Sequence, residues 1–244
     1  MNTGIRFLVC ALFLTGSVHA CFDTYLFLQK GSMVYPEGEI VVEGAGEYTV
    51  NSMGTGDFDL FSGSFNAFYG AADRFSLQMG ISSAEKQRTS FEIDEWGIRG
   101  VYNLISNYQG GYNLDVVLEH HSPFDMLESM VEISTPNTYH MRDFTFVVHP
   151  VLAFGTDIST SLRGHGGAFY RFGSSALIGV GAEFESAQSS SHFGERLVES
   201  ETATSLFLGA RIGQGAFFQN EFIKGWGKNS KDFGYAATVK VMIR

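Results

Sequence analysis

The sequence predicts an all-β fold, a single antiparallel β-barrel of about twelve strands that spans a membrane, and three observations support this prediction. Apolar and polar residues alternate in segments of roughly ten residues along most of the chain, which is typical of barrel strands with one apolar face. Short connections alternate with longer ones, as turns and outer loops do in transmembrane barrels. Charged residues make up 17% of the chain, below the roughly 25% of soluble domains.

The clearest alternation lies between Phe58 and Ile81, where two strands flank the turn Gly70-Ala71-Ala72-Asp73. Successive side chains of a strand point to opposite faces, so this hairpin has one apolar and one polar face. An aromatic residue stands beside the turn on each arm, as expected at a membrane interface. The residues expected to face lipid are Phe61, Gly63, Phe65, Ala67, Tyr69, Phe75, Leu77, Met79 and Ile81.

The same alternation predicts the remaining strands. Pro136-Asn137 is expected to form a turn, and Pro150 is expected to form a bulge because proline has no N–H for the sheet ladder. The segment 216–228 leaves its inward face undecided. The expected strands outside the hairpin are 39–50, 92–105, 111–121, 128–134, 141–154, 158–171, 176–189, 202–213, 216–228 and 232–244.

Residues 1–20 are interpreted as a secretory signal peptide, with Arg6, an apolar stretch at 7–14 and small residues before the cleavage position. Cleavage after Ala20 would leave Cys21 at the mature N-terminus, either lipidated or incidental. Residues 21–38 are expected to form a periplasmic leader that plugs the barrel, caps its periplasmic end or adds a short strand. The transmembrane β-barrel is assigned to residues 39–244, and no later apolar run reaches the ~18 residues of a spanning helix.

Charge and motifs exclude several classes of protein. The formal net charge is −10 and no run of Lys and Arg occurs, so binding to nucleic acid is not expected. Of the two cysteines, Cys10 belongs to the signal peptide, which leaves no intrachain disulfide. The histidines lack a metal-binding spacing, and no cofactor or metal is expected.

One pair of residues suggests catalysis. His120-x-Ser122 resembles the His-x-Ser pair of the outer-membrane phospholipase, a twelve-stranded barrel, and this spacing puts base and nucleophile on one strand face. The phospholipase continues with Asn-Gly, whereas this chain continues with Pro123-Phe124. We therefore expect no catalytic residue and interpret His120 as a histidine at the membrane interface.

The polar faces of the strands carry charges that a barrel of this size either pairs across its lumen or exposes along a narrow pore. We expect them to pair around a constriction, because unpaired buried charge is costly. The open pore is the alternative. The candidate lumen and constriction residues are Arg74, Arg99, Asp115, Glu119, His149, Arg163, His165, Glu183 and Arg211.

Three runs, FNAFYGAADRFSLQMGI at 65–81, IDEWGIRGVYNLI at 93–105 and YNLDVVLEHHSP at 112–123, resemble a family of Gram-negative outer-membrane β-barrels. The similarity covers residues 39–244 and rests on a hairpin and a strand motif without catalytic residues. Some members are linked to phenol-degradation pathways as transporters. Such barrels usually end in an aromatic residue that the assembly machinery reads, whereas this chain ends in Ile243-Arg244, a weaker assembly signal.

The resemblance and the alternation together imply a porin-like protein of the cell outer membrane. The expected function is a passive channel or transporter for small, hydrophobic or aromatic solutes. Its expected partners are outer-membrane lipids, the barrel assembly machinery and a small-molecule solute, and not nucleic acid. The alternatives are a non-conducting structural or adhesion-type barrel and, third, an outer-membrane lipolytic enzyme.

Overall fold

The computed structural model describes residues 33–50, 59–86, 90–107, 111–124, 129–155, 160–186, 188–189, 196–198, 200–213, 215–227 and 230–243. The expected signal peptide, Cys21 and most of the leader lie outside these residues, so their interpretation stays a prediction. Within the described ranges, no helix is long and apolar enough to cross a membrane.

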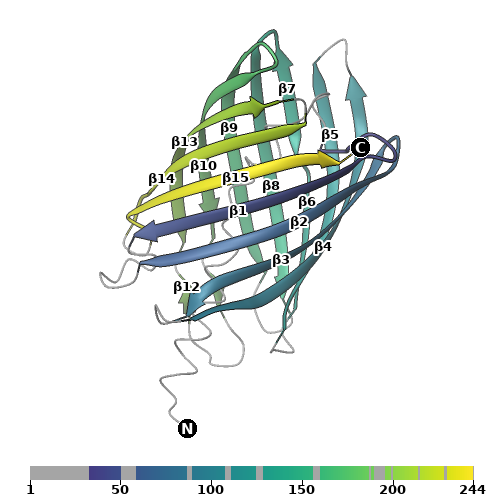
Figure 1. Cartoon of the computed structure of the whole chain (residues 1–244). Helices are drawn as coiled ribbons and strands as arrows, with labels where there is room; N and C mark the ends of the chain where they lie inside the picture. Colours follow the sequence, from purple (N-terminus) through teal and green to yellow (C-terminus); the bar gives the residue numbers. More distant parts are fainter. Residues whose placement is uncertain are drawn as a thin grey trace.

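The described strands form one closed antiparallel sheet, with a small separate pair, β11 and β12 (Figure 1). The sheet closes where β1 pairs with β15, from Ile40 opposite Ile243 to Val50 opposite Phe233. β6 and β7 share one strand position, so the barrel has twelve positions, and the predicted fold class is confirmed. The bounds are β1 Ile40–Val50, β2 Leu60–Ala72, β3 Phe75–Lys86, β4 Ser90–Asn107, β5 Tyr112–Pro123, β6 Met130–Ser134, β7 Asn137–Met141, β8 Phe144–Gly155, β9 Ser161–Phe172, β10 Ala176–Glu185, β11 Gln188–Ser189, β12 Arg196–Val198, β13 Glu201–Ile212, β14 Ala216–Gly225 and β15 Phe233–Ile243.

The turn predicted at Pro136-Asn137 is wrong, because the chain continues there in the same direction. β6 and β7 keep one register against β8 on either side of Pro136. Pro136 interrupts the ladder because it has no N–H, but its carbonyl still accepts a hydrogen bond from Asp115 N at 3.0 Å. The reversal occurs instead at residues 142–143, where Arg142 has a φ of 56°.

The bulge predicted at Pro150 does not form, since β8 and β9 pair without a register shift. Pro150 accepts a hydrogen bond from Thr135 N at 3.2 Å, but it cannot donate one in return to the Thr135 carbonyl. The side-chain amide of Asn137 donates to that carbonyl at 2.7 Å. This amide replaces the missing backbone donor, so the strand stays regular.

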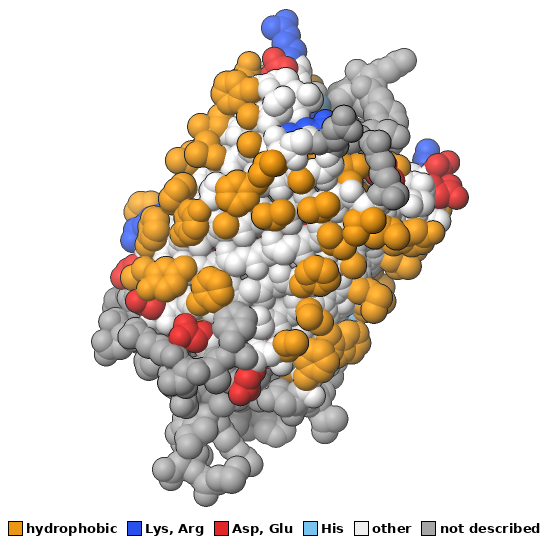
Figure 2. All heavy atoms as spheres, in the orientation of Figure 1, with side chains coloured by type: hydrophobic (Ala, Val, Ile, Leu, Met, Phe, Trp, Pro, Cys, Tyr) orange, Lys and Arg blue, Asp and Glu red, His pale blue; other side chains and the backbone are white. Residues whose placement is uncertain are grey.

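The outer wall of the barrel is apolar, as the alternation predicts. Met79 and Val148 are 63% and 62% exposed, and Figure 2 shows hydrophobic side chains over the wall with charged side chains near its edges. The undecided strand β14 places Phe222 outward and Gln219 and Glu221 inward. A wall of this kind is stable where it meets lipid, because the closed ladder leaves no strand edge unpaired.

The two ends of the barrel differ in the length of their connections. The short-turn end carries the connections 73–74, 108–111, 142–143, 173–175 and 213–215, together with Ile40 and Ile243. The long-loop end carries the connections 51–59, 87–89, 124–129, 156–160, 186–200 and 226–232. In outer-membrane barrels the short turns are periplasmic and the longer loops extracellular, which orients this barrel.

Candidate functional site

The inner wall of the barrel brings together eight of the nine residues that the sequence predicts for the lumen. Arg74 is the exception and a correction, because it is exposed in the two-residue turn before β3. The strand alternation does not extend into a turn, so the phase counted along β3 does not apply to Arg74. The eight inward residues are Arg99, Asp115, Glu119, His149, Arg163, His165, Glu183 and Arg211.

Arg99 on β4 anchors the first group of ion pairs. Its Nε donates to Glu119 Oε2 at 2.5 Å, and its Nη1 donates to Gln78 Oε1 at 3.1 Å. His121 joins the same group, with Nε2 3.0 Å from Glu119 Oε1 and Nδ1 2.9 Å from Glu95 Oε1. The alternation of apolar and polar residues predicts that Glu95 and Glu119 face the lumen. The contact of His121 with Glu95 depends on how β4 and β5 are aligned, and the sequence of one strand does not indicate that alignment.

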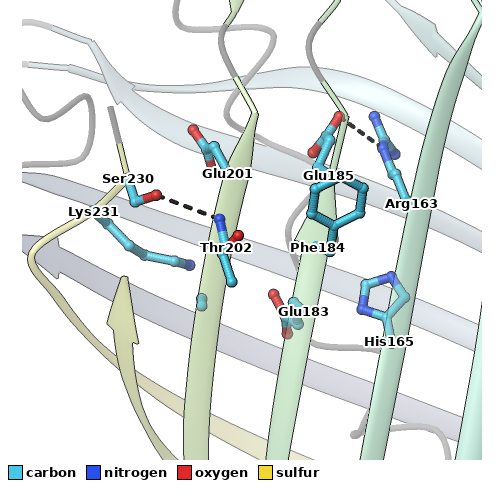
Figure 3. A pocket seen from close by; sticks show the side chains of 10 residues that line it. Arg163, His165, Glu183, Phe184, Glu185, Glu201, Thr202, Ser230 and Lys231 are labelled. Atoms are coloured by element: carbon cyan, nitrogen blue, oxygen red, sulfur yellow. Dashed lines mark hydrogen bonds and ion pairs between the residues drawn. The ribbon is translucent and has the colours of Figure 1, made fainter. Parts of the chain in front are cut away.

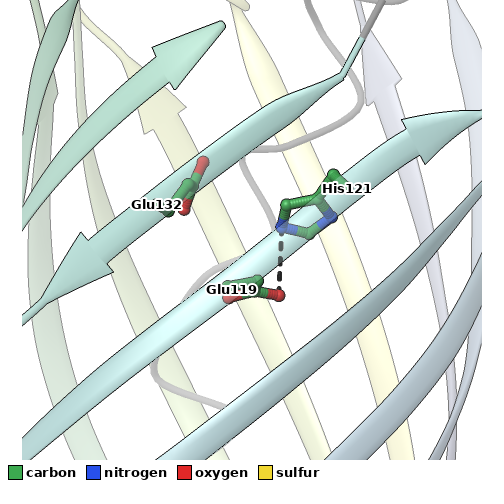
Figure 4. Close-up of side chains that lie close together, drawn as sticks. All are labelled: Glu119, His121 and Glu132. Atoms are coloured by element: carbon green, nitrogen blue, oxygen red, sulfur yellow. Dashed lines mark ion pairs between the residues drawn. The ribbon is translucent and has the colours of Figure 1, made fainter.

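Arg163 on β9 anchors the second group. Its Nη1 lies 2.5 Å from Glu132 Oε1 on β6, and its Nε lies 2.8 Å from Glu185 Oε1 on β10. The two groups approach each other, since atoms of Glu119, His121 and Glu132 lie within 4.8 Å of one another (Figure 4). This trio has ligand types that a divalent cation accepts. Arg99 and Arg163 already occupy the two glutamates, so an ion-pair network explains the trio without a metal.

Two lysines that the sequence analysis did not single out pair with the carboxylates of β1. Lys240 Nζ lies 2.8 Å from Glu43 Oε2, and Lys231 Nζ lies 2.9 Å from Glu47 Oε1. Asn66 Nδ2 also donates to Glu43 Oε1 at 2.9 Å. The inward phase of β15 could have indicated Lys240, whereas Lys231 precedes β15 and has no strand phase.

His149 and His165 lie directly opposite each other on β8 and β9, with ring centroids 5.6 Å apart. Both are buried on the lumen side. The two rings therefore lie against each other on the lumen side of β8 and β9.

An apolar layer crosses the lumen in its short-turn half. Phe169 and Phe207 meet edge to face, with centroids 6.2 Å apart. A Cβ on Gly179 between them would lie 2.3 Å from the Phe207 ring, so only glycine leaves room for this contact. The layer consists of Val101, Val117, Val147, Phe169, Leu177 and Phe207.

The N-terminal segment Met33–Gly38 enters the barrel at its short-turn end, and its residues 33–35 lie inside and complete this layer. Met33 is 3% exposed and packs against the layer, and its N–H donates to Asp115 Oδ2 at 2.7 Å. Tyr35 N donates to Ser76 Oγ at 2.8 Å, and the Tyr35 ring lies 5.2 Å from the Phe68 ring. The segment fits closely, because a Cβ on Gly70 would lie 1.9 Å from the carbonyl oxygen of Pro36.

The long-loop half of the lumen contains a hollow whose empty space, including the part open to solvent, is about 390 Å³. Figure 3 shows its side chains on β9, β10, β13 and the segment before β15. The charged and titratable residues that line it are Arg163, His165, Glu183, Glu185, Glu201 and Lys231.

His120 and Ser122 do not form a nucleophile with its base. The His120 ring packs against Trp96, with centroids 5.3 Å apart, and Ser122 Oγ donates to its neighbour's carbonyl, Pro123 O, at 3.4 Å. His120 thus takes the aromatic surroundings expected of a residue near the membrane interface.

Comparison with known proteins supports the fold. No family model and no curated protein matches the sequence. The COG4313 outer membrane channel from Pseudomonas putida F1 superposes with a TM-score of 0.71 at 9% identity, covering 88% of this chain and 98% of that chain. The NanC porin gives 0.65 at 9% identity, with 83% and 100% covered. The KdgM porin in complex with disordered oligogalacturonate gives 0.62 at 11% identity, with 84% and 99% covered.

At these identities the likeness establishes the fold, and the function has to be argued from the site. The closed sheet of twelve positions, the apolar outer wall and the superpositions agree with one another. Together they identify the chain as a transmembrane β-barrel of the outer-membrane type, similar in fold to a channel and to two porins.

Proposed function

We propose that the protein is a passive outer-membrane channel for small solutes, narrowed on the periplasmic side by the segment Met33–Gly38. The observation that carries this proposal is the inner wall, which has buried charged residues near both ends, Lys240 and Glu43 near one and Arg163 and Glu185 near the other. A polar interior of this kind is typical of the water-filled barrels of the outer membrane.

The apolar layer argues for solutes with an apolar or aromatic part. In the part of the lumen that the structure describes, this layer is a zone where a passing molecule would meet Val, Leu and Phe side chains rather than charges. The runs at 65–81, 93–105 and 112–123 resemble barrels linked to phenol degradation, which makes small aromatic molecules the first solutes to test. The KdgM porin is described in complex with an oligogalacturonate, so a barrel of similar fold can hold a solute.

The segment Met33–Gly38 is joined to the wall by backbone hydrogen bonds, and its side chains Met33 and Tyr35 can be removed without altering a strand. Two backbone donors, Met33 N and Tyr35 N, hold it to Asp115 and Ser76. Displacing it would leave the apolar layer as the narrowest part of a continuous path.

The test is the single-channel conductance of the refolded protein in planar bilayers, with phenol and benzoate examined as blockers. We expect a small conductance, and a larger one in the double variant Met33→Gly with Tyr35→Gly, which removes two of the side chains that this segment places in the lumen. Glu37→Gln is the matched control, because Glu37 belongs to the same segment but is exposed. Absence of current from both the wild type and the double variant would favour the non-conducting structural barrel.

A further inference from the structure

The hollow at the long-loop end holds an excess of negative charge. The register of β10 sets Glu185 opposite Glu201 and Glu183 opposite His165. Like charges directly opposite on neighbouring strands destabilise a sheet. A cation bound beside Glu185 and Glu201 on the lumen side would therefore reduce the repulsion between these two carboxylates.

The described cations that line the hollow, Arg163 and Lys231, are fewer than its carboxylates. Arg163 is shared between Glu132 and Glu185, and Lys231 is bonded to Glu47 at 2.9 Å. Among the described residues, two cations, Arg163 and Lys231, therefore face five carboxylates in and around the hollow. The five carboxylates are Glu47, Glu132, Glu183, Glu185 and Glu201.

His165 gives a second, independent indication of a ligand. The side chain is 9% exposed and lines the hollow beside Glu183 (Figure 3). Its Nδ1 is buried and has no hydrogen-bond partner among the described residues. Leaving a buried polar atom unsatisfied is costly, and a neutral imidazole offers an acceptor on one of its two nitrogens.

The pKa of Lys231 indicates the electrostatic potential inside the hollow. Lys231 precedes β15, and its side chain lines the hollow. Burial alone would lower the pKa of Lys231, but the carboxylates of Glu47, Glu183 and Glu201 outweigh burial and hold that pKa above its usual value. The surroundings thus favour a positive charge even where water is largely excluded.

We propose that this hollow binds the ammonium group of a small cationic solute on its way through the barrel, and that the channel selects cations over anions. Glu183 and Glu201 supply the charge, and His165 accepts one N–H of the ammonium group. The apolar layer below would then receive the hydrocarbon part of the same molecule. The inference rests on the proposed channel function and adds the charge of the solute to it.

The experiment measures the reversal potential across a KCl gradient and the block of current by 1,4-diaminobutane. The variant is Glu183→Gln with Glu201→Gln, and Glu201→Gln alone is the milder form at a half-buried position. Glu92→Gln is the matched control, since it removes the same charge from an exposed residue near the same end of the barrel. Calorimetry of the detergent-solubilised protein with 1,4-diaminobutane measures binding without any need for current.

We expect a cation-selective reversal potential in the wild type and in Glu92→Gln. In the double variant the reversal potential should move towards zero, and the dissociation constant for 1,4-diaminobutane should rise about tenfold. An unselective or anion-selective wild type, or an unchanged diamine affinity in the double variant, would overturn the inference and leave the channel standing. If no current flows in any variant, the channel function fails instead, and calorimetry alone then decides whether the hollow binds the amine.

Discussion

Removing Lys240 tests whether a carboxylate of the inner wall needs its paired cation. Lys240 is 1% exposed, its Nζ lies 2.8 Å from Glu43 Oε2, and its ammonium group stands 4.9 Å from the centre of the Phe68 ring. Lys240→Met keeps most of the side-chain volume but leaves a carboxylate inside the barrel with Asn66 Nδ2 at 2.9 Å.

The magnitude follows from the burial of this pair. Breaking a buried ion pair by removing one partner costs about 3–5 kcal/mol, and the remaining Asn66 donor places the expected loss near the lower bound. With a urea slope of about 2 kcal/mol/M, a loss of 3 kcal/mol lowers the unfolding midpoint by about 1.5 M. The assay is urea unfolding from lipid vesicles, followed by tryptophan fluorescence and by the heat-modifiable gel band.

Two further variants make this test specific. The double variant Lys240→Met with Glu43→Leu removes both charges and should recover most of the lost stability, because a buried pair replaced by apolar groups is often neutral. Lys224→Met removes an exposed lysine on β14 and should change the free energy of unfolding by less than about 1 kcal/mol. A midpoint for Lys240→Met close to that of the wild type, or a double variant no more stable than the single one, would refute the reasoning.

Three other predictions concern the outer wall, the N-terminal segment and the ion pairs. Met79→Arg places a charge at a 63% exposed position of the lipid face and should cost about 2–4 kcal/mol in vesicle unfolding, whereas Met79→Leu should cost almost nothing; equal effects would mean that β3 has the opposite phase. Gly70→Ala should displace Pro36 and raise the channel conductance. Gly44→Ala should leave the conductance unchanged, because a Cβ at Gly44 meets no atom within 4 Å. Equal conductances of the two variants would place the segment Met33–Gly38 outside the conducting path. Arg99→Ala should alter conductance or ion selectivity with only a modest loss of heat stability, because His121 still contacts Glu119 at 3.0 Å; no change in either property would show that Arg99 does not line the path.

The sequence predicts the faces of the strands well, because lipid and lumen differ in polarity at every strand position. Arg99, Arg163 and Glu183 therefore lie inward, as their alternation indicates. The prediction fails where the chain leaves the strand geometry, as at Arg74 in its turn. It also fails where one side chain compensates for another, as when Asn137 satisfies the carbonyl that Pro150 cannot reach.

Partners across the lumen could not be predicted, because they depend on the register of strands far apart in the sequence. The bond between Lys231 and Glu47 joins residues 184 positions apart, and no local pattern connects them. The position of Met33 in the lumen could not be predicted either. It depends on Asp115, whose carboxylate accepts hydrogen bonds from both Met33 N and Asn103 Nδ2. Residues 33–38 form no strand, so strand alternation cannot indicate which side chains of the wall they contact.

The seam between β1 and β15 has a consequence for the order in which the barrel can be made. It pairs the first barrel strand with the last, over all eleven residues of each and as far as Ile243. Until the chain as far as Ile243 is present, β1 and β15 pair only with β2 and β14 and each keeps one edge unpaired, and an unpaired edge is not tolerated in lipid. Insertion therefore has to wait for the complete chain, and loss of even the last few residues would leave a gap in the wall beside Ile40.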